Sequence, residues 1–379
     1  MSTTESGPSV EEFADSARAW LADHRAEAPR DYGAILPPDL RDPAASWQRT
    51  LFDAGFAGIH WPVEYGGRGL TPAHSAAWTT ECALAQVPPF LNMVGIVLTG
   101  GSILMFGTPK QQAQHLEPII RGDKVWCQLF SEPGAGSDLA GLSTTAVRDG
   151  DHFVVNGQKV WCSNGRVADW GILMARTDAT VAPHKGISFF LCDMTLPGID
   201  VRPLRQMNGE SEFDEVFLTD VEIPAEQLLG PLNEGWQVGM ATLMNERGYI
   251  GAAGIALNRR LEKMLELGGD LDPIARQQLA RLWSRGKALW MMGQRQGPVA
   301  TILGSLTKLG TTELMFDVAM FAASLEGPGA MLEGTATVGV LTAPGARIAG
   351  GTSQIQRNLI GERILGLPKE PRPPSPGAR

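Results

Sequence analysis

The spacing of apolar residues changes twice along this chain of 379 residues. In residues 8–120, apolar side chains such as Val10 and Phe13 recur every three to four positions, which is typical of amphipathic helices. Residues 121–230 hold short apolar runs separated by turn residues, which is typical of strands. Helical spacing returns in residues 231–368. This order predicts an α+β protein in which two helical regions enclose a β segment.

The middle region carries two turn signals. Asn156-Gly157 supplies the positive φ angles of a type I′ turn, so it predicts a hairpin joining residues 152–155 to residues 158–161. Asp149-Gly150 is a second turn signal just upstream. The even spacing of the strands predicts a small antiparallel barrel or sandwich. Further strands are expected in the apolar runs 170–175, 186–191 and 215–218.

Capping residues place the helices. Thr71-Pro72 and Thr108-Pro109 are each a cap followed by a proline at the first helical position. After residue 231 we expect a long helix that ends at Gly268-Gly269-Asp270, a second from about Asp272-Pro273, and a third over 303–326. The expected domains are an N-terminal all-helical domain (1–120), a β-barrel domain (121–230), a C-terminal helical domain (231–368) and a flexible tail (369–379).

Composition excludes several classes of protein. The net charge of −9 argues against a nucleic-acid-binding protein, which normally has a basic surplus. The four cysteines show no CxxC pair or zinc spacing, so we expect reduced thiols in a cytoplasmic protein and no metal site. The uncharged stretch 82–109 is interrupted by prolines and glycines, so no membrane span is expected. The N-terminus has no apolar segment of the kind found in signal peptides.

The common nucleotide and catalytic loops are absent from the sequence. It contains no GxGxxG after a strand, no GxxxxGK[ST], no HExxH and no GxSxG. A nucleotide cofactor would therefore have to bind outside the usual phosphate loops.

Three segments have the composition of a ligand site. Residues 130–138 (FSEPGAGSD) form a glycine-rich loop whose N–H groups can face an anion or a carbonyl oxygen, although a plain turn has the same composition. On the strand that ends the hairpin, Trp161 and Ser163 share one face and could stack on and bond to a planar ligand; the alternative is a core tryptophan. Residues 350–357 (GGTSQIQR) are a polar turn that enters a helix.

Together with residues 61–67 (WPVEYGG) and 107–111 (GTPKQ), these segments resemble the acyl-CoA dehydrogenase flavoprotein family over about residues 10–368, with the motifs in family order. The resemblance implies an N-terminal helical domain, a central antiparallel β-barrel and a C-terminal four-helix bundle, with FAD between the barrel and the C-terminal helices. By the same resemblance, the cofactor-binding residues are Gln128, Phe130, Ser131, Trp161, Ser163, Thr352 and Gln354, and the substrate-binding residues are Ser137, Arg247, Gly350 and Gly351.

The sequence departs from the family pattern in two places. Many members carry the catalytic glutamate directly before the Gly-Thr turn, where this chain has Gly350. A second subgroup carries it on the first helix of the C-terminal domain, before an arginine, and Glu246 matches that position. The Arg-x-Phe-Gly cofactor segment is also missing, and Arg276 is the residue that the replacing segment offers to the pyrophosphate.

The helix around Glu246 supports a role for its carboxylate. Its neighbours at helical spacing are Thr242, Leu243, Tyr249 and Ile250, so Glu246 lies on an apolar face where a solvated glutamate is not expected. Burial raises the pKa of a carboxyl group, which makes it a candidate general base. An ion pair with Arg247 or another arginine is the structural alternative.

The resemblance implies α,β-dehydrogenation of an acyl-CoA thioester. Glu246 would take the α-proton, FAD the β-hydride, and the amide of Gly350 with a flavin ribityl hydroxyl would polarise the thioester oxygen. Residues 343–357 look like an actinobacterial branch that includes paired subunits acting on steroid-derived thioesters, so fatty-acid or steroid catabolism is expected in a bacterial cytoplasm. Electron-transfer flavoprotein is the implied acceptor, in a homotetramer or an α2β2 heterotetramer. The alternatives are a weakly active or non-catalytic subunit of a heterotetramer, and an acyl-CoA oxidase or monooxygenase.

Overall fold

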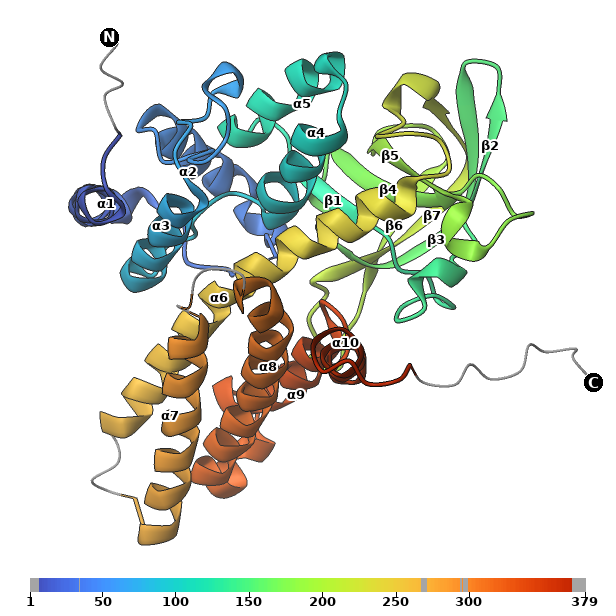
Figure 1. Cartoon of the computed structure of the whole chain (residues 1–379). Helices are drawn as coiled ribbons and strands as arrows, with labels where there is room; N and C mark the ends of the chain where they lie inside the picture. The colour runs from blue at the N-terminus through green and yellow to red at the C-terminus, as the bar shows by residue number, and fades with distance from the viewer. Residues whose placement is uncertain (1–6, 34, 267–270, 294, 296–298, 370–379) are drawn as a thin grey trace, which may run out of the picture. The chain divides into compact units, whose positions relative to one another are not determined.

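The computed structural model describes residues 7–33, 35–266, 271–293, 295 and 299–369, without the side chains of residues 245–253, 255, 256 and 299–302. The chain divides into two compact units, Met1–Glu246 and Arg247–Arg379. The first unit holds a helical part followed by a sheet, and the described part of the second is helical (Figure 1). A helical domain, a central sheet and a helical domain are what the sequence predicts, so the predicted fold class is confirmed.

The N-terminal helices begin where the capping residues predict. Ser9 caps the first helix, and Thr71 and Thr108 each form a capping box at the helix that follows. The uncharged stretch 82–109 begins with the end of the third helix, and in its second half a π-helix, Val94–Thr99, runs directly into the fourth helix. The helices are α1 (Val10–His24), α2 (Arg41–Asp53), α3 (Pro72–Ala85), α4 (Gly100–Phe106) and α5 (Pro109–Arg121).

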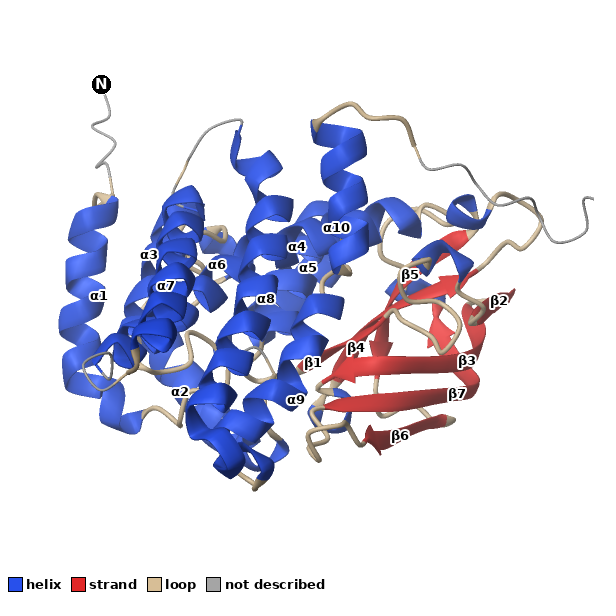
Figure 2. Ribbon diagram, turned by 90° about the horizontal axis from the view of Figure 1, so that it is seen from below, coloured by secondary structure: helices blue, strands red, loops and turns tan. Residues whose placement is uncertain are grey.

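Seven strands form one curled sheet (Figure 2). They are β1 (Trp126–Leu129), β2 (Thr145–Asp149), β3 (His152–Ser163), β4 (Trp170–Arg176), β5 (Ile187–Asp193), β6 (Ile199–Leu204) and β7 (Phe213–Pro224). The order is β1-β4-β2-β3-β7-β6, and β5 pairs with β4 on its other edge. Because β1 runs parallel to β4, the sheet is mixed, whereas the sequence led us to expect an antiparallel one.

The predicted hairpin at Asn156-Gly157 is wrong. Strand β3 runs through both residues, and the turn lies at the upstream signal, between β2 and β3. The register with β7 shifts at this point, so Asn156 is a bulge residue whose amide bonds to Asp220. A Cβ on Gly157 would lie 2.3 Å from Thr144 Oγ1, so the glycine permits a close crossing and does not form a turn.

The sheet has two apolar faces because alternate residues of a strand point to opposite sides. Leu173 on β4 and Phe190 on β5 point into the curl of the sheet, where they pack with Phe153 and Val216. Met174 and Phe189 belong to the other face, in the core that also contains Trp126 of β1 and, from the helical part, Trp61, Leu116 and Ile119. This second core joins the helices to the sheet.

The second unit continues from a helix that starts in the first. This helix, α6 (Gly235–Glu266), is followed by α7 (Pro273–Gly293), α8 (Val299–Glu326), α9 (Thr335–Ile348) and α10 (Ser353–Leu359). The two predicted helices after the first are confirmed, although α8 begins before residue 303; the predicted end at 268–270 lies outside the described residues. Their shared core contains Leu261, Leu279, Leu314 and Val318.

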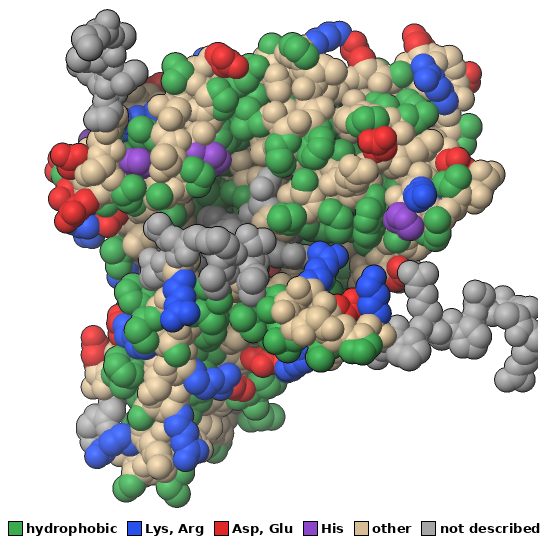
Figure 3. Space-filling model, in the orientation of Figure 1, with side chains coloured by type: hydrophobic (Ala, Val, Ile, Leu, Met, Phe, Trp, Pro, Cys, Tyr) green, Lys and Arg blue, Asp and Glu red, His purple; other side chains and the backbone are tan. Residues whose placement is uncertain are grey.

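Charge divides unequally between the two units. By sequence, Met1–Glu246 carries 16 Lys and Arg against 31 Asp and Glu, a net −15, and Arg247–Arg379 carries 16 against 10, a net +6. Figure 3 shows Lys and Arg side chains gathered along the second unit. The whole-chain value of −9 therefore hides a basic part that attracts anions.

Candidate functional site

The glycine-rich loop after β1 is a rigid turn with an open outer face. The backbones of Glu132 and Ala135 exchange two hydrogen bonds, of 2.9 and 3.0 Å, across Pro133-Gly134. An added Cβ at Gly134 or at Gly136 would meet no atom within 4 Å. The loop therefore exposes backbone at its tip, which is what a site for a flat or anionic ligand needs.

Four predicted site residues lie on or beside this loop. Phe130 is buried and its ring meets Phe189 edge to face, with centroids 5.6 Å apart. Gln128 and Ser131 are half-buried, and Ser137 is exposed at the far side of the loop. Of the four, Ser137 is the most accessible to solvent.

The end of β3 presents Trp161 outward. The ladder with β7 is regular at Lys159 and resumes at Cys162, so one extra residue is accommodated between them. Trp161 adopts φ 60°, a left-handed backbone that costs a non-glycine residue on the order of 1–3 kcal/mol. Trp161 is 56% exposed, Cys162 packs in the core inside the sheet, and Ser163 is half-buried. Trp161 and Ser163 thus lie on one face, and the alternative of a core tryptophan is wrong.

The structure brings these two segments together. The Val160 amide donates to Ser131 O at 2.9 Å, so the residues before Trp161 pair with the loop. Asn164, buried with φ 67°, then fixes the strand end by hydrogen bonds to Asn92 and to Leu36 O. Hydrogen bonds therefore fix the chain just before and just after Trp161, whose indole is exposed.

The third segment lies in the second unit. Gly350 and Gly351 have φ values of 62° and 92°, so both occupy the left-handed region that favours glycine. Gln356 Nε2 donates to Gly350 O at 3.0 Å, and the buried Lys308 donates to Gly351 O at 2.7 Å. Thr352 caps α10 by accepting from the Ile355 amide. Gln354 is exposed in the first turn of α10.

Three further predictions concern residues of α6 and α7. Helix α6 includes the positions of Glu246 and Arg247, but their side chains lie outside the described residues. Arg276 is exposed in the first turn of α7, where its guanidinium donates to Leu271 O at 3.2 Å. The roles proposed for these three residues stay predictions.

Glu132 and Lys159 lie within the segments described above, and the sequence alone predicted no role for either. The two side chains form a buried ion pair, with Nζ 2.8 Å from Oε1. Burial raises the pKa of the Glu132 carboxyl, but the Lys159 charge and hydrogen bonds from Thr144 and Ser143 outweigh it and lower that pKa to about 2. A charged residue at an inward position of an apolar strand was the signal that could have found Lys159.

In the described parts of the chain, no helix has the length and apolar content needed to cross a bilayer. No group of three or more His, Cys, Asp or Glu is arranged there to hold a metal ion. The four cysteines are buried free thiols.

Models of one family match most of the chain. The N-terminal domain of acyl-CoA dehydrogenases matches residues 8–123, the middle domain residues 127–221, and the C-terminal domain residues 271–365. The chain therefore belongs to the acyl-CoA dehydrogenase family and is an enzyme of that family.

Two similar proteins are named acyl-CoA dehydrogenases of Mycobacterium tuberculosis. The chain is 37% identical to the acyl-CoA dehydrogenase IpdE1 of Mycobacterium tuberculosis, over 95% of this chain and 98% of the relative. It is 39% identical to FadE34 of the same organism, over 89% of this chain and 47% of that longer protein.

Solved structures share the fold over nearly the whole length. The Tcur3481-Tcur3483 steroid acyl-CoA dehydrogenase superposes with a TM-score of 0.84 at 25% identity, covering 98% of this chain and all of the other. The ChsE4-ChsE5 complex of Mycobacterium tuberculosis superposes with a TM-score of 0.78 at 27% identity, with the same coverage.

Proposed function

We propose that this protein uses FAD to introduce an α,β double bond into an acyl-CoA thioester, with Glu246 as the base. The observation that carries the proposal is the outward, left-handed Trp161 beside Ser163 and the loop of Phe130. A large exposed aromatic in a strained backbone is costly unless a ligand covers it, so the site suits a flat ring system.

The residues present fit a flavin. Trp161 would pack on the ring and Ser163 would bond to its edge, with Gln128, Phe130 and Ser131 around it. Thr352, Gln354 and Arg276 are the contacts that we assign to the second unit. The chemistry that FAD supplies when bound is acceptance of a hydride, which no side chain can do.

The chain's own residues would manage the proton and the oxyanion. We assign to the Glu246 carboxylate removal of the proton from the α-carbon, a step in which a positioned base contributes about 10²–10⁴-fold. The Gly350 amide would donate to the thioester oxygen as enolate character develops. Gly351, Arg247 and Ser137 complete the substrate contacts that we propose.

A branched or ring-bearing acyl group is the substrate class that we favour, in steroid-type catabolism, over a straight fatty acyl chain. By the family resemblance, Gly350 stands where many members carry the catalytic glutamate, so its missing side chain would leave room for such a group beside the thioester. One solved relative is named a steroid acyl-CoA dehydrogenase. The net +6 of the second unit suits the phosphates of CoA.

A second candidate is a subunit that works only in a two-protein assembly. Two similar solved structures are named as pairs, Tcur3481-Tcur3483 and ChsE4-ChsE5. The missing Arg-x-Phe-Gly segment agrees with a cofactor site completed by a partner. We therefore propose a tetramer, α2β2 or homomeric, with electron-transfer flavoprotein as acceptor; co-purification with a neighbouring gene product separates the two.

The first experiment is an anaerobic visible spectrum of the purified protein during titration with saturated acyl-CoAs, from straight-chain to branched to steroid-derived. Bleaching of bound flavin by the ring-bearing class is the expected result. Bound flavin that no thioester bleaches would favour the paired subunit. Rapid reoxidation of reduced flavin by O₂ would favour an oxidase or monooxygenase.

The role of Glu246 is tested by Glu246→Gln, with Glu262→Gln as the matched control. Glu262 lies on the same helix but is half-exposed and pairs with Lys287 at 2.6 Å. We expect Glu246→Gln to keep FAD and lose at least about 10²-fold in the rate of flavin reduction, and Glu262→Gln to reduce flavin normally. Near-normal reduction by the first variant contradicts the assignment.

A further inference from the structure

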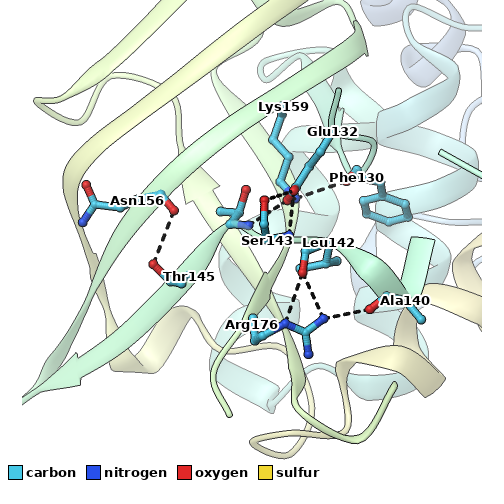
Figure 4. Close-up of polar contacts among 10 residues, drawn as sticks. Phe130, Glu132, Ala140, Leu142, Ser143, Thr145, Asn156, Lys159 and Arg176 are labelled. Carbon is cyan, nitrogen blue, oxygen red and sulfur yellow. Dashed lines mark hydrogen bonds and ion pairs between the residues drawn. The ribbon is translucent and has the colours of Figure 1, made fainter. Parts of the chain in front are cut away.

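A buried ion pair connects the two segments that form the first-unit part of the site (Figure 4). Lys159 is fully buried on β3, and the side chain of Glu132, in the loop after β1, is 4% exposed. Lys159 Nζ lies 2.8 Å from Glu132 Oε1 and donates to Phe130 O at 3.1 Å. One ammonium group therefore holds both a carboxylate and the backbone of the loop.

Both oxygens of the Glu132 carboxylate accept hydrogen bonds. Its Oε2 accepts from the amide and the hydroxyl of Ser143, at 2.6 and 2.7 Å, and its Oε1 accepts from the Thr144 amide at 2.9 Å. The carboxylate thereby ties the start of the loop to the residues that lead into β2. Both ends of the loop are thus attached, through Lys159, to β3.

The ion pair is next to the residues that we assign to the cofactor, both in the chain and through hydrogen bonds. The Phe130 carbonyl accepts a hydrogen bond from the Lys159 ammonium, and the Ser131 carbonyl accepts one from the amide of the next residue, Val160. Trp161 follows at once, at the point where the strand leaves its regular ladder. The separation of Phe130–Ser131 from Trp161 is therefore set by these two bonds.

Stability alone does not explain a pair of this kind. Removing two charges from water costs about as much as their attraction returns, and apolar side chains of similar volume are often as stable. A buried pair with every acceptor filled does specify one arrangement of its neighbours. That arrangement is what a cofactor site needs.

We propose that Glu132 and Lys159 are positioning residues that hold Phe130–Ser131 and Trp161–Ser163 at the spacing that the flavin requires, without touching it. The inference rests on the proposed function. A misplacement of about 1 Å caused by a mutation far from the reacting atoms can lower a catalytic rate about a hundredfold.

The test compares the double variant Glu132→Gln/Lys159→Met, which removes both charges and leaves neither unpaired, with Arg176→Met. Arg176 donates to Leu142 O and Ala140 O and so holds the same loop from its other side. The readouts are thermal midpoint, FAD affinity, the flavin absorption spectrum, and hydrogen exchange of segments 128–137 and 157–165 without FAD.

We expect the double variant to exchange faster in both segments, to bind FAD about ten- to a hundredfold more weakly and to shift the flavin spectrum. We expect Arg176→Met to lower the thermal midpoint at least as much, with FAD affinity and spectrum unchanged. Unchanged exchange in the double variant, or a loss of FAD affinity equal to that of Arg176→Met, overturns the inference. Failure of the wild-type protein to bind FAD overturns the proposed function instead, and the exchange data still decide whether the pair positions Trp161.

Discussion

His115 on α5 couples the stability of the first unit to pH. The residue is 3% exposed, and its ring lies edge-on to Trp126 and Trp170, with centroids 5.4 and 4.7 Å away. Its Nε2 has no hydrogen-bond partner among the described residues. Burial disfavours the charged ring and lowers the pKa of His115 from 6.5 to about 4.

The direction of the effect follows from proton binding. Between pH 6.5 and about 4, the unfolded chain binds a proton at His115 that the folded chain does not, so the free energy of unfolding falls as the pH falls. A difference of about 2.5 pH units, at about 1.4 kcal/mol each, gives a loss of about 3 kcal/mol that is complete below pH 4.

The perturbation is His115→Gln, which removes this titration. Urea unfolding followed by tryptophan fluorescence, from pH 7.5 to 4, should show that the wild-type protein loses about 3 kcal/mol more than the variant. Glu132 does not interfere, because its lowered pKa of about 2 makes its contribution present above pH 4.5 and lost mainly as pH falls toward 2. Parallel stability curves for the two proteins, or a His115 ring whose pKa is near 6.5 in the folded state, would refute the reasoning.

Two further substitutions test a close packing contact and a buried hydrogen bond. Gly100→Ala should destabilise the protein by about 1–3 kcal/mol, because its Cβ would lie 2.1 Å from the ring of the buried Trp61; thermal melting checks this, and Gly304→Ala, whose Cβ meets nothing within 4 Å, should melt no lower than wild type. Lys308→Met should cost about 1–3 kcal/mol in urea unfolding, since it takes the ammonium donor from Gly351 O. A variant that unfolds at the wild-type urea concentration would show that this bond contributes little.

Local signals predicted the helices well. Thr71 and Thr108 cap the helices that follow them because a capping side chain bonds to an amide only three residues away. The same short range explains the success of apolar spacing in α1 and α7. A motif of five ordered segments was also enough to predict the family.

Asn156-Gly157 shows where local reasoning failed. The dipeptide has the composition of a tight turn, but Thr144 crosses so close to Gly157 that the glycine is needed for the crossing. The parallel pairing of β1 with β4 was missed for a similar reason, since their partners lie 44 residues apart, as with Trp126 and Trp170. Neither contact leaves a mark within a window of a few residues.

The sequence by itself determined the order of helices and strands, the family and the residue types offered to a ligand, because periodicity, capping and motif spacing all act within a few residues. Only the tertiary structure decided that Trp161 faces outward in a left-handed backbone and that Glu132 pairs with Lys159. Those two charges lie 27 residues apart. The burial of a charge and the identity of its partner depend on which chain segments approach each other in space, and folding decides that.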